Sequence, residues 1–512
     1  MSHEWTPIPG DFYYGLPSQP RLLASTRPAV DFVPQSPFKT TPKHIYTFPS
    51  GHSIRPLWDT IIVPQLVSII KAHDITGPAC LDAVCIGPSE VEAVATVWIG
   101  VGEGALSSDT ASSMVKEVKE FCVGMGAKHF EVEIRVTDVQ RLTKFLDPES
   151  FPINIHKLAD PFCYTLGTPI STAKYPNAIG TGGLLLSLPG YDKLYMLTAR
   201  HVVDHDHRSR LDPSNVQDRT VVRIHTPTTF RDSRKELVAR IETLTAMMNG
   251  YQRRLETAER MGREIPDTLR QSVSFVEAEL YALTQWLHRL DTSFSSENDR
   301  SFGQTFAYPP IKFNVGPATS DANGVAGYTE DWCLLETDIQ SDTGLVNHLS
   351  LLDIDDRTLA LSRSDKSPIM DVDDDYLRIG GHLTQVDLES QSFAVLKNGA
   401  TSSLTLGITN GLHSYWREEI AWSKELAVIS LGQESSQSGL EYFSQGGDSG
   451  STVIDRQGRV VGMMHAGCKR GKEVVWGQDG IKVASPTDIT YVTPWWWLAR
   501  RMREFGLVPT VV

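Results

Sequence analysis

Apolar and polar positions follow two alternating periodicities along the first third of the chain. Helical spacing of apolar residues alternates with short β-prone runs, in the order helix, strand, strand, helix and strand. The five segments are 57–71, 80–86, 91–101, 112–125 and 130–136. This order predicts a small α+β domain over residues 46–155. Residues 1–45 are rich in Pro, Ser and Thr without sustained periodicity, which predicts an irregular arm.

From about residue 156 the pattern becomes that of β-strands. The runs 179–186 and 193–199 flank Pro189-Gly190 and predict a hairpin, and 221–225 predicts a further strand. Later elements continue the same β-rich pattern as far as a helix near the end of the chain. They are the strands 393–399, 404–409 and 460–467 and the helix 494–502.

A long helical segment interrupts this β-rich part. Apolar residues recur there at alternating steps of four and three, in two seams. The seams run over 237–258 and 269–290. A Gly/Pro-containing turn at 262–266 separates them, so residues 233–291 are predicted to form an antiparallel helical hairpin. Ser233 followed by Glu236 is a candidate capping box for its first helix.

The stretch Leu352–Asp375 is rich in aspartate. It lacks the Asp-x-Asp-x-Asp-Gly loop and the distal glutamate of an EF-hand, which argues against a calcium site. A solvated linker is therefore the interpretation that we favour for it.

Composition narrows the functional classes. The chain of 512 residues is 40% hydrophobic and carries a formal net charge of −14. Such a charge argues against nucleic-acid binding, because contacts with phosphates need a basic face. No stretch reaches the ~20 apolar residues of a membrane span. The N-terminal residues lack the basic and apolar regions of a signal peptide, so a cytoplasmic protein is expected.

The cysteines show neither a paired framework nor the spacing of a zinc site. In an intracellular chain of this size they are expected to be reduced thiols. They are Cys80, Cys85, Cys122, Cys163, Cys333 and Cys468. No metal or other cofactor is expected.

The sequence Gly-Gly-Asp-Ser-Gly-Ser at 446–451 places a serine in a glycine-rich turn before a β-prone run. The glycines let the backbone N–H groups of Gly447 and Ser449 point at one spot beside the Ser449 hydroxyl. That spot suits the charged oxygen of a tetrahedral intermediate, so Ser449 is the candidate nucleophile and these N–H groups the candidate oxyanion hole. Ser444 and Ser451 lack this arrangement of glycines. The alternative to a catalytic function is an ordinary β-turn.

A serine nucleophile needs an imidazole that accepts its proton. The apolar run 194–199 leads into Thr-Ala-Arg-His, which ends at His201. None of the nearby His205, His207 and His225 follows such a strand end. His201 is therefore the candidate base.

The imidazole in turn needs a buried carboxylate that holds it in one tautomer. Asp331 directly precedes the apolar run Trp332–Leu335, whereas Asp338 follows that run. Asp321 is a further competitor. Asp331 is the candidate because it stands at the start of a strand that is expected to be buried.

These segments together resemble the trypsin/chymotrypsin-like serine peptidase superfamily. Thr-Ala-Arg-His is similar to its Thr-Ala-x-His signature, and Asp-Trp-Cys-Leu-Leu to its Asp-x-Cys/Ala-Leu-Leu stretch. The order His201, Asp331, Ser449 is that of chymotrypsin. The resemblance implies a mainly β fold, a chymotrypsin-like double β-barrel over 156–505, with the helical hairpin as a surface insertion. More loosely, the preceding α+β domain is similar to that of uncharacterised fungal trypsin-like proteins.

The resemblance also implies a substrate pocket. Phe443, six positions before Ser449, would lie at the base of the P1 pocket, and His465 and Gly467 would line its wall. Phe443 carries no charge, so nothing supports a preference for Lys or Arg, and an apolar or undetermined preference is expected.

The sequence departs from the superfamily at two points, of which the second bears on activation. Val202 stands where secreted relatives have a cysteine, and no Ile/Val-Val-Gly-Gly start occurs at 160–180. In secreted relatives a new N-terminus pairs with the aspartate before the serine, which is Asp448 here. Asp448 must therefore find another partner, or the oxyanion loop stays unformed until something organises it. We expect control by the N-terminal domain or by the hairpin.

Three hypotheses follow. The first is a serine endopeptidase that cleaves protein or peptide substrates through an acyl-enzyme and is regulated by, or processes, its own N-terminal domain. The second is a catalytically silent scaffold or sensor that binds a protein partner through the hairpin 233–291. The third is an enzyme that cuts itself once and then stops. Neither nucleic acid nor membrane is an expected partner.

Overall fold

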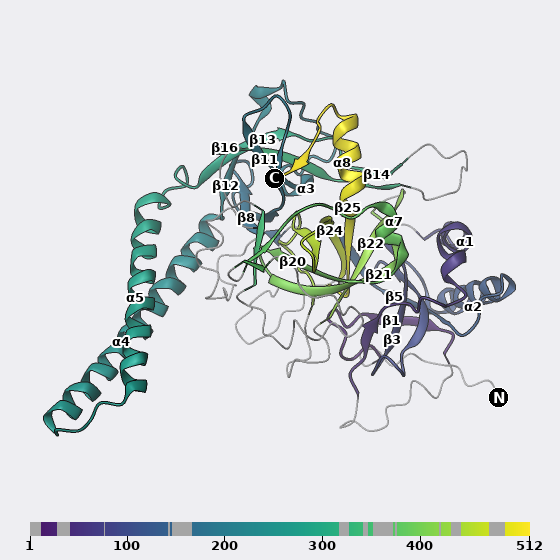
Figure 1. Ribbon diagram of the computed structural model, residues 1–512. Helices are drawn as coiled ribbons and strands as arrows, with labels where there is room; N and C mark the ends of the chain where they lie inside the picture. The colour runs from purple at the N-terminus through teal and green to yellow at the C-terminus, as the bar shows by residue number, and fades with distance from the viewer. Residues whose placement is uncertain are drawn as a thin grey trace.

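The computed structural model describes residues 12–27, 41–75, 77–141, 144–145, 166–316, 327–340, 347–351, 372–373, 376–418, 421–431, 442–469 and 487–512. Two β-sheet assemblies pack against each other, with a helical hairpin on one side and an α+β unit on the other (Figure 1). The predicted linker 352–375 lies outside the described residues except for Val372–Asp373. No described helix combines the length and the apolar character that crossing a membrane requires.

A closed antiparallel barrel forms the later part of the described chain. Its strands pair in the order β21, β20, β23, β24, β25 and β22, and β22 pairs back with β21 to close the ring. They are β20 (Ala394–Gly399), β21 (Ser403–Arg417), β22 (Trp422–Ser430), β23 (Thr452–Asp455), β24 (Val460–Lys469) and β25 (Ile489–Pro494). Branched side chains such as Val395, Val428 and Val453 are buried together in one core cluster, as the alternation of strand side chains requires. The predicted strands 393–399, 404–409 and 460–467 are confirmed.

The earlier β-rich part forms a half-barrel sheet. Its strands pair in the order β26, β10, β11, β16, β13, β12, β8, β9 and β7. They are β7 (Lys144–Phe145), β8 (Thr168–Thr172), β9 (Ala178–Gly182), β10 (Leu185–Ser187), β11 (Lys193–Ala199), β12 (Val221–Ile224), β13 (Ser301–Ala307), β16 (Trp332–Gln340) and β26 (Thr510–Val511). Leu197 of this sheet and Met463 of the barrel belong to one core, so the two assemblies pack together. The described part of the fold is mainly β and consistent with a double β-barrel.

The predicted strand 179–186 is divided in two. β9 pairs with β8, whereas β10 pairs with β11, and the Gly183 N–H between them donates to the Leu197 carbonyl at 2.8 Å. Three shorter elements matter for the site: β15 (Tyr328–Glu330), the single turn α3 (Arg200–Val203) after β11, and α8 (Trp495–Glu504), which confirms the C-terminal helix.

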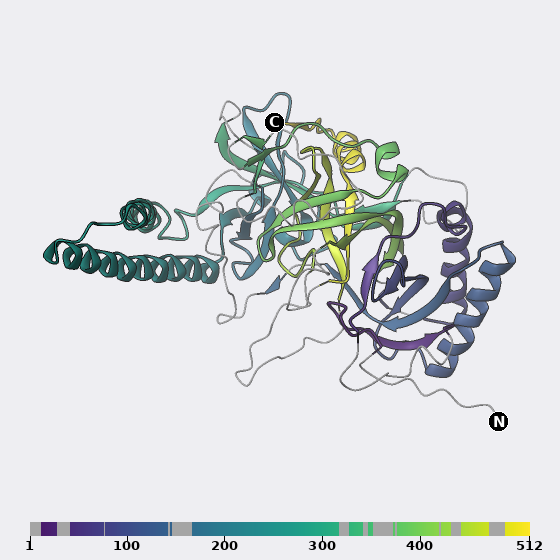
Figure 2. The same cartoon turned by 60° about the horizontal axis from the view of Figure 1, so that its bottom comes forward.

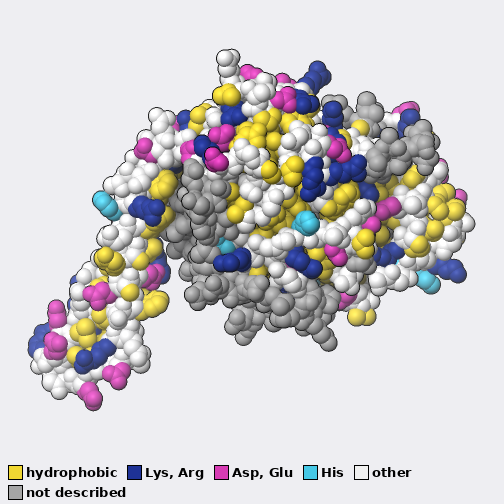
Figure 3. All heavy atoms as spheres, turned by 45° about the horizontal axis from the view of Figure 1, so that its top comes forward, with side chains coloured by type: hydrophobic (Ala, Val, Ile, Leu, Met, Phe, Trp, Pro, Cys, Tyr) yellow, Lys and Arg dark blue, Asp and Glu magenta, His cyan; other side chains and the backbone are white. Residues whose placement is uncertain are grey.

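The helical hairpin is inserted between β12 and β13 and projects away from the body (Figures 1 and 2). It consists of α4 (Pro227–Arg260) and α5 (Asp267–Ser293). Leu237, Leu244 and Val276 of the predicted seams are buried between the helices. On the face in Figure 3, acidic, basic and hydrophobic side chains are intermingled along it.

The predicted start of the first hairpin helix is wrong. The capping box is formed by Thr226 and Thr229, whose side chains each accept the other residue's backbone N–H, at 3.0 and 2.9 Å. Pro227 occupies the first turn, where its missing N–H costs nothing. The helix therefore begins six residues before Ser233, which is buried within it.

The N-terminal unit contains the predicted order helix, strand, strand, helix, strand. Its elements are β1 (Arg21–Ser25), β2 (His44–Tyr46), α1 (Val63–Ala72), β3 (Ala79–Gly87), β4 (Val94–Val101), α2 (Ser108–Gly124) and β5 (Glu131–Val136). The irregular arm is wrong at 21–25 and from His44, because β1 pairs with β5 and β2 with β3. Both partners lie far along the sequence, so no local pattern reveals them.

This unit is continuous with the closed barrel. β3 pairs with β21, where Leu81 faces Tyr415. Beyond β5, the strand β6 (Asp138–Arg141) pairs with β24, and β7 pairs with β9 of the half-barrel sheet. One stretch of chain therefore leaves the N-terminal unit and contacts both β-sheet assemblies.

Candidate active site

The register of two neighbouring strands brings His201 and Asp331 together. Ala199 at the end of β11 pairs with Trp332 at the start of β16, so the residues next to these positions meet. His201 Nδ1 lies 2.6 Å from Asp331 Oδ2, and the His201 backbone N–H donates to Asp331 Oδ1 at 3.0 Å. Both residues are buried. The carboxylate therefore holds the ring with Nδ1 as the donor and directs Nε2 away from Asp331.

Ser449 lies in the turn before β23, and this turn packs against the end of β11. Gly450 has φ +96°, and a Cβ added there would lie 3.1 Å from Ala199 N and closer still to other backbone, so glycine is required. The Thr181 N–H donates to the Ser449 carbonyl at 2.8 Å. The turn of the closed barrel that contains Ser449 is thus attached to the strand end that precedes His201.

The Ser449 hydroxyl donates to the carbonyl of His465 at 3.1 Å. Within the described part of the chain, this is the hydrogen bond that its Oγ makes, and it does not run to His201. Ser449 has no exposed surface, and His201 is 3% exposed. Proton transfer to Nε2 therefore needs a rotation of the hydroxyl, and catalytic contacts of this kind commonly tighten only when substrate binds.

The candidate oxyanion hole is formed by a turn in a left-handed conformation. Gly447 has φ +101°, where an added Cβ would overlap Thr401 and lie 3.1 Å from Ile179 Cγ2. Among the described residues, no acceptor takes the backbone N–H of Gly447 or Ser449. The two N–H groups predicted for this function are available for a developing oxyanion.

Asp448, between these two residues, is held by a buried cation. Lys397 Nζ of β20 lies 3.3 Å from Asp448 Oδ2. The carboxylate also accepts the backbone N–H groups of Thr401 and Ser402, at 2.9 and 3.0 Å, and the Ser402 hydroxyl at 2.5 Å. Burial lowers the pKa of the Lys397 ammonium, and the Asp448 carboxylate opposes that effect. Asp448 therefore has a partner within the chain.

The three predicted pocket residues lie in different surroundings. Phe443 is buried in the core of the closed barrel against Val428. The His465 imidazole is also buried, 3.3 Å from Glu425 Oε1, so its carbonyl rather than its ring faces Ser449. Gly467 pairs with β6, which covers that edge of β24. Neither the Phe443 ring nor the His465 ring lines an open pocket.

The competing histidines have other surroundings. His205 packs on the Tyr175 ring, His207 is exposed, and His225 lies beside Thr229 at the start of the hairpin. None of these contacts involves Ser449 or Asp331.

The competing carboxylates and serines are likewise engaged elsewhere. Asp338 pairs with Lys193 at the surface, and Asp321 lies outside the described residues. Ser444 contacts the hydroxyl of Thr487, and Ser451 donates to the Asp448 carbonyl. The geometry favours the residues predicted from sequence.

Two supporting residues were missed by the sequence analysis. Thr181 of β9 donates its hydroxyl to the Gly447 carbonyl at 2.9 Å and its N–H to the Ser449 carbonyl. Arg200 is fully buried and donates to the carbonyls of Asp204 and Pro309, which holds the loop after α3. Arg200 could have been found from the sequence, because it is an arginine inside an apolar run. Nothing in the local sequence singles out Thr181.

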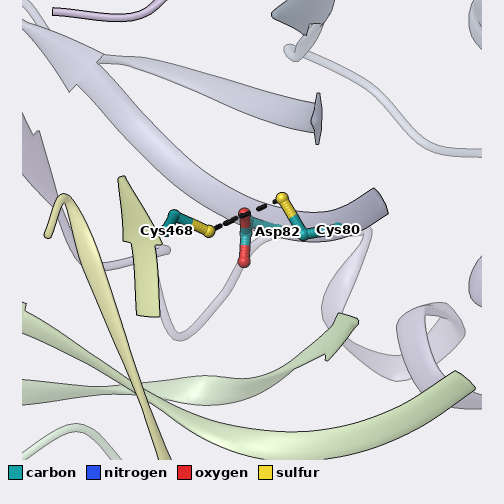
Figure 4. A group of neighbouring side chains, drawn as sticks. All are labelled: Cys80, Asp82 and Cys468. Carbon is teal, nitrogen blue, oxygen red and sulfur yellow. Dashed lines mark hydrogen bonds between the residues drawn. The ribbon is translucent and has the colours of Figure 1, made fainter. Parts of the chain in front are cut away.

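A second buried cluster joins the N-terminal unit to the barrel. Cys80 and Asp82 of β3 face Cys468 of β24, with their ligand atoms within 4.8 Å of one another (Figure 4). The Arg135 guanidinium donates to Asp82 Oδ2 at 3.0 Å, and burial raises the pKa of the Cys468 thiol. A metal ion needs deprotonated thiols and would be repelled by Arg135, so the cluster suits a polar contact between the two units.

The thiols in the described part of the chain are free. The five described cysteines are all buried, and Cys163 lies outside the described residues. The sulfur atoms of Cys80 and Cys468 lie 3.5 Å apart.

Comparison with known proteins adds no assignment. No protein-family model matches this chain, and no curated protein matches it significantly. The function of this chain must therefore be inferred from the geometry of the site.

Proposed function

We propose that this chain is a serine endopeptidase of the trypsin/chymotrypsin-like superfamily, with His201, Asp331 and Ser449 as catalytic residues. The observation that carries the proposal is the 2.6 Å contact between His201 Nδ1 and Asp331 Oδ2. A buried carboxylate on one ring nitrogen leaves the other nitrogen as a base for a hydroxyl. The attachment of the Ser449 turn to the end of β11 supplies that hydroxyl nearby. The closed barrel and the half-barrel sheet support a double β-barrel of the chymotrypsin type.

In this proposal Ser449 Oγ turns from the His465 carbonyl toward His201 Nε2 and attacks the carbonyl carbon of a peptide bond. The hydroxyl proton moves to Nε2, and Asp331 stabilises the imidazolium that forms. The N–H groups of Gly447 and Ser449 donate to the oxyanion. When the C–N bond breaks, the leaving amine takes the proton from His201. Water then hydrolyses the acyl-enzyme by the same two steps.

Lys397 answers a question that the sequence left open, namely which group pairs with Asp448. An oxyanion loop that depends on a new N-terminus is inactive until the chain is cut. Here the ammonium of Lys397 contacts Asp448 within the intact chain. The proposed enzyme therefore needs no maturation cleavage to order the N–H groups of Gly447 and Ser449.

Labelling with a fluorophosphonate, which bonds covalently to an activated serine, tests the proposal. We expect the full-length chain to be labelled and both Ser449→Ala and His201→Ala to remain unlabelled. Ser451→Ala is the matched control, because Ser451 is a buried serine of the same turn whose Oγ donates to the Asp448 carbonyl at 2.6 Å. Labelling that persists in Ser449→Ala would contradict the proposal. So would the absence of labelling both from the folded wild type and from folded Gln140→Pro, a change in β6 where that strand pairs with β24.

A further inference from the structure

Two strands, β23 and β6, pair with successive parts of the same edge of β24. β25 pairs with its opposite edge from Gly462 to Cys468. The remaining edge is covered by β23 as far as Met463, and by β6 from Ala466 onward. The gap between β23 and β6 is where the nucleophile lies, because the carbonyl of His465 accepts the Ser449 hydroxyl there.

The direction of the backbone groups agrees with this arrangement. The Cys468 carbonyl accepts the Asp488 N–H on the β25 side. Successive residues of a strand point their N–H and C=O groups to alternate sides, so those of Gly467 point toward β6. Gln140 is the residue of β6 that faces Gly467.

The other side of Ser449 has a similar arrangement. The Thr181 N–H of β9 donates to the Ser449 carbonyl at 2.8 Å. Ile179, two residues earlier, presents its backbone groups on the same edge of β9. Lys144 of β7 pairs with Ile179. β7 therefore lies on the edge of β9 that faces the nucleophile turn.

One continuous stretch of chain thus pairs with an edge strand on each side of Ser449. β6 lies on one side of Ser449, along β24, and β7 lies on the other side, along β9. Both run antiparallel to the strands that they contact. An extended peptide added to an exposed strand edge is a common way for a protein to bind a peptide segment. In a substrate placed in this way, the residues N-terminal of the cleaved bond would pair with β24. The residues C-terminal of that bond would pair with β9.

We propose that the segment formed by β6 and β7 occupies the substrate-binding cleft of its own chain and excludes other peptides from Ser449. This inference rests on the proposed function and names the regulator of the same site, which is the N-terminal unit of the chain itself. The burial of both Ser449 and His201 agrees with a covered cleft.

The N-terminal unit anchors this segment. The Thr137 N–H, one residue before β6, donates to the Val101 carbonyl of β4 at 2.9 Å. Val139 is buried in a core cluster with Trp416 and Tyr491 of the barrel. A segment tethered this closely has an effective concentration on the order of millimolar, which is enough to outcompete dilute substrates. Displacement of β6, rather than secretion-type maturation, would then open the site.

Substitution of Gln140 by proline tests the inference, because proline cannot donate to the strand ladder. Ser108→Pro is the matched control. Ser108 is exposed at the first position of α2, where proline is tolerated, and Ser107 before it is already extended. In the full-length chain we expect Gln140→Pro to be labelled by the fluorophosphonate at least ~10-fold faster than wild type, since the fraction of open sites limits apparent binding. We expect Ser108→Pro to be labelled at the wild-type rate.

Three further measurements keep the test decisive. Gln140→Gly, which weakens the strand without removing a donor, should label at an intermediate rate and serves if the proline variant fails to fold. A synthetic peptide of residues 137–146, added to Gln140→Pro, should slow its labelling, whereas a scrambled peptide should not. Intact mass of the wild type reveals whether the segment is also cut; a Ser449-dependent cut between Arg141 and Lys144 supports its position in the cleft.

The outcomes separate the two proposals. If wild type and both Gln140 variants are labelled at the same rate, the inference is overturned and the proposed function stands. If the folded wild type and the folded Gln140 variants all stay unlabelled, the proposed function fails and the inference fails with it. Faster labelling of Ser108→Pro would also overturn the inference, because that change does not touch β6.

Discussion

Lys397 Nζ lies 3.3 Å from Asp448 Oδ2, and neither side chain is exposed to solvent. Asp448 stands between the two residues whose N–H groups form the candidate oxyanion hole. A buried carboxylate that loses its cation either becomes protonated or moves toward water. We therefore expect the Lys397–Asp448 pair to hold Gly447 and Ser449 in position.

Replacement of Lys397 by methionine is expected to lower the rate of fluorophosphonate labelling by about 10²–10³, the usual effect of losing an oxyanion-hole donor. The change leaves the Asp448 carboxylate buried without its cation, so the turn around Ser449 should rearrange. Lys193→Met is the control, because Lys193 pairs with Glu336 at the partly exposed side of the half-barrel sheet. Equal labelling rates for Lys397→Met and wild type would show that the pair has no such influence.

The same pair predicts a difference between the alkaline behaviour of activity and of stability. Burial lowers the pKa of Lys397 below its ordinary value of 10.5, so the ammonium is lost at a lower pH than in a free lysine. Labelling should therefore fall as pH rises through that lowered pKa. The free energy of unfolding should change in the opposite direction. Because the pKa of Lys397 is lower in the folded than in the unfolded chain, its contribution to stability is fully present above pH 10.5. That contribution is lost as pH falls through the folded pKa.

The measurement is the labelling rate and the free energy of unfolding of the same sample, from neutral pH to about 10.5. We expect the rate to fall while the contribution of Lys397 to stability rises. The difference in unfolding free energy between wild type and Lys397→Met isolates that contribution. A loss of labelling that follows global unfolding would contradict this account.

Elements with strong local patterns could be predicted from the sequence. The helical seam through Leu237 and Leu244 and the β-prone run at 193–199 each contain enough apolar residues to specify one structure. His201, Asp331 and Ser449 could be named because each stands beside a strand with a characteristic residue order. The 2.6 Å contact between His201 and Asp331 agrees with that part of the prediction.

Long-range pairing could not be predicted in this way. β6 contains four residues and is a strand because of β24, whose sequence lies more than three hundred positions away. Arg21–Ser25 is a strand for a similar reason, its pairing with β5. Lys397 in an apolar run suggests a solvated face of a strand, and nothing local reveals that it faces Asp448 inside the protein.

Arg135 is expected to be essential for the contact between the N-terminal unit and the barrel. Its guanidinium lies 3.0 Å from Asp82 Oδ2 and 3.3 Å from Asp488 Oδ2, and all three side chains are fully buried. Arg135→Met would leave two buried carboxylates close together, which should lower the free energy of unfolding by about 3–5 kcal/mol. Chemical denaturation measures this change.

The triple variant Arg135→Met, Asp82→Asn, Asp488→Asn is the matched control for that prediction. Neutral amides remove the uncompensated charge, so this variant should recover part of the lost stability. Arg210→Met, which removes an exposed partner of Asp212, should change stability by less than about 1 kcal/mol. A loss in the triple variant equal to that of Arg135→Met alone would mean that packing, rather than charge, is responsible.

His225, at the base of the hairpin, predicts a loss of stability in acid. Burial lowers the pKa of its imidazole to about 3, with Arg300 adding to the effect, whereas the ordinary value is 6.5. The neutral ring is therefore favoured by folding, so the contribution of His225 is present above pH 6.5 and is lost as pH falls toward about 3. Over that range the free energy of unfolding should fall by on the order of 4 kcal/mol because of this group alone. His225→Gln should remove that part of the pH dependence, and His288→Gln, at an exposed position on α5, should not. Identical pH profiles of wild type and His225→Gln would show that the His225 imidazole accepts a proton without cost to the fold.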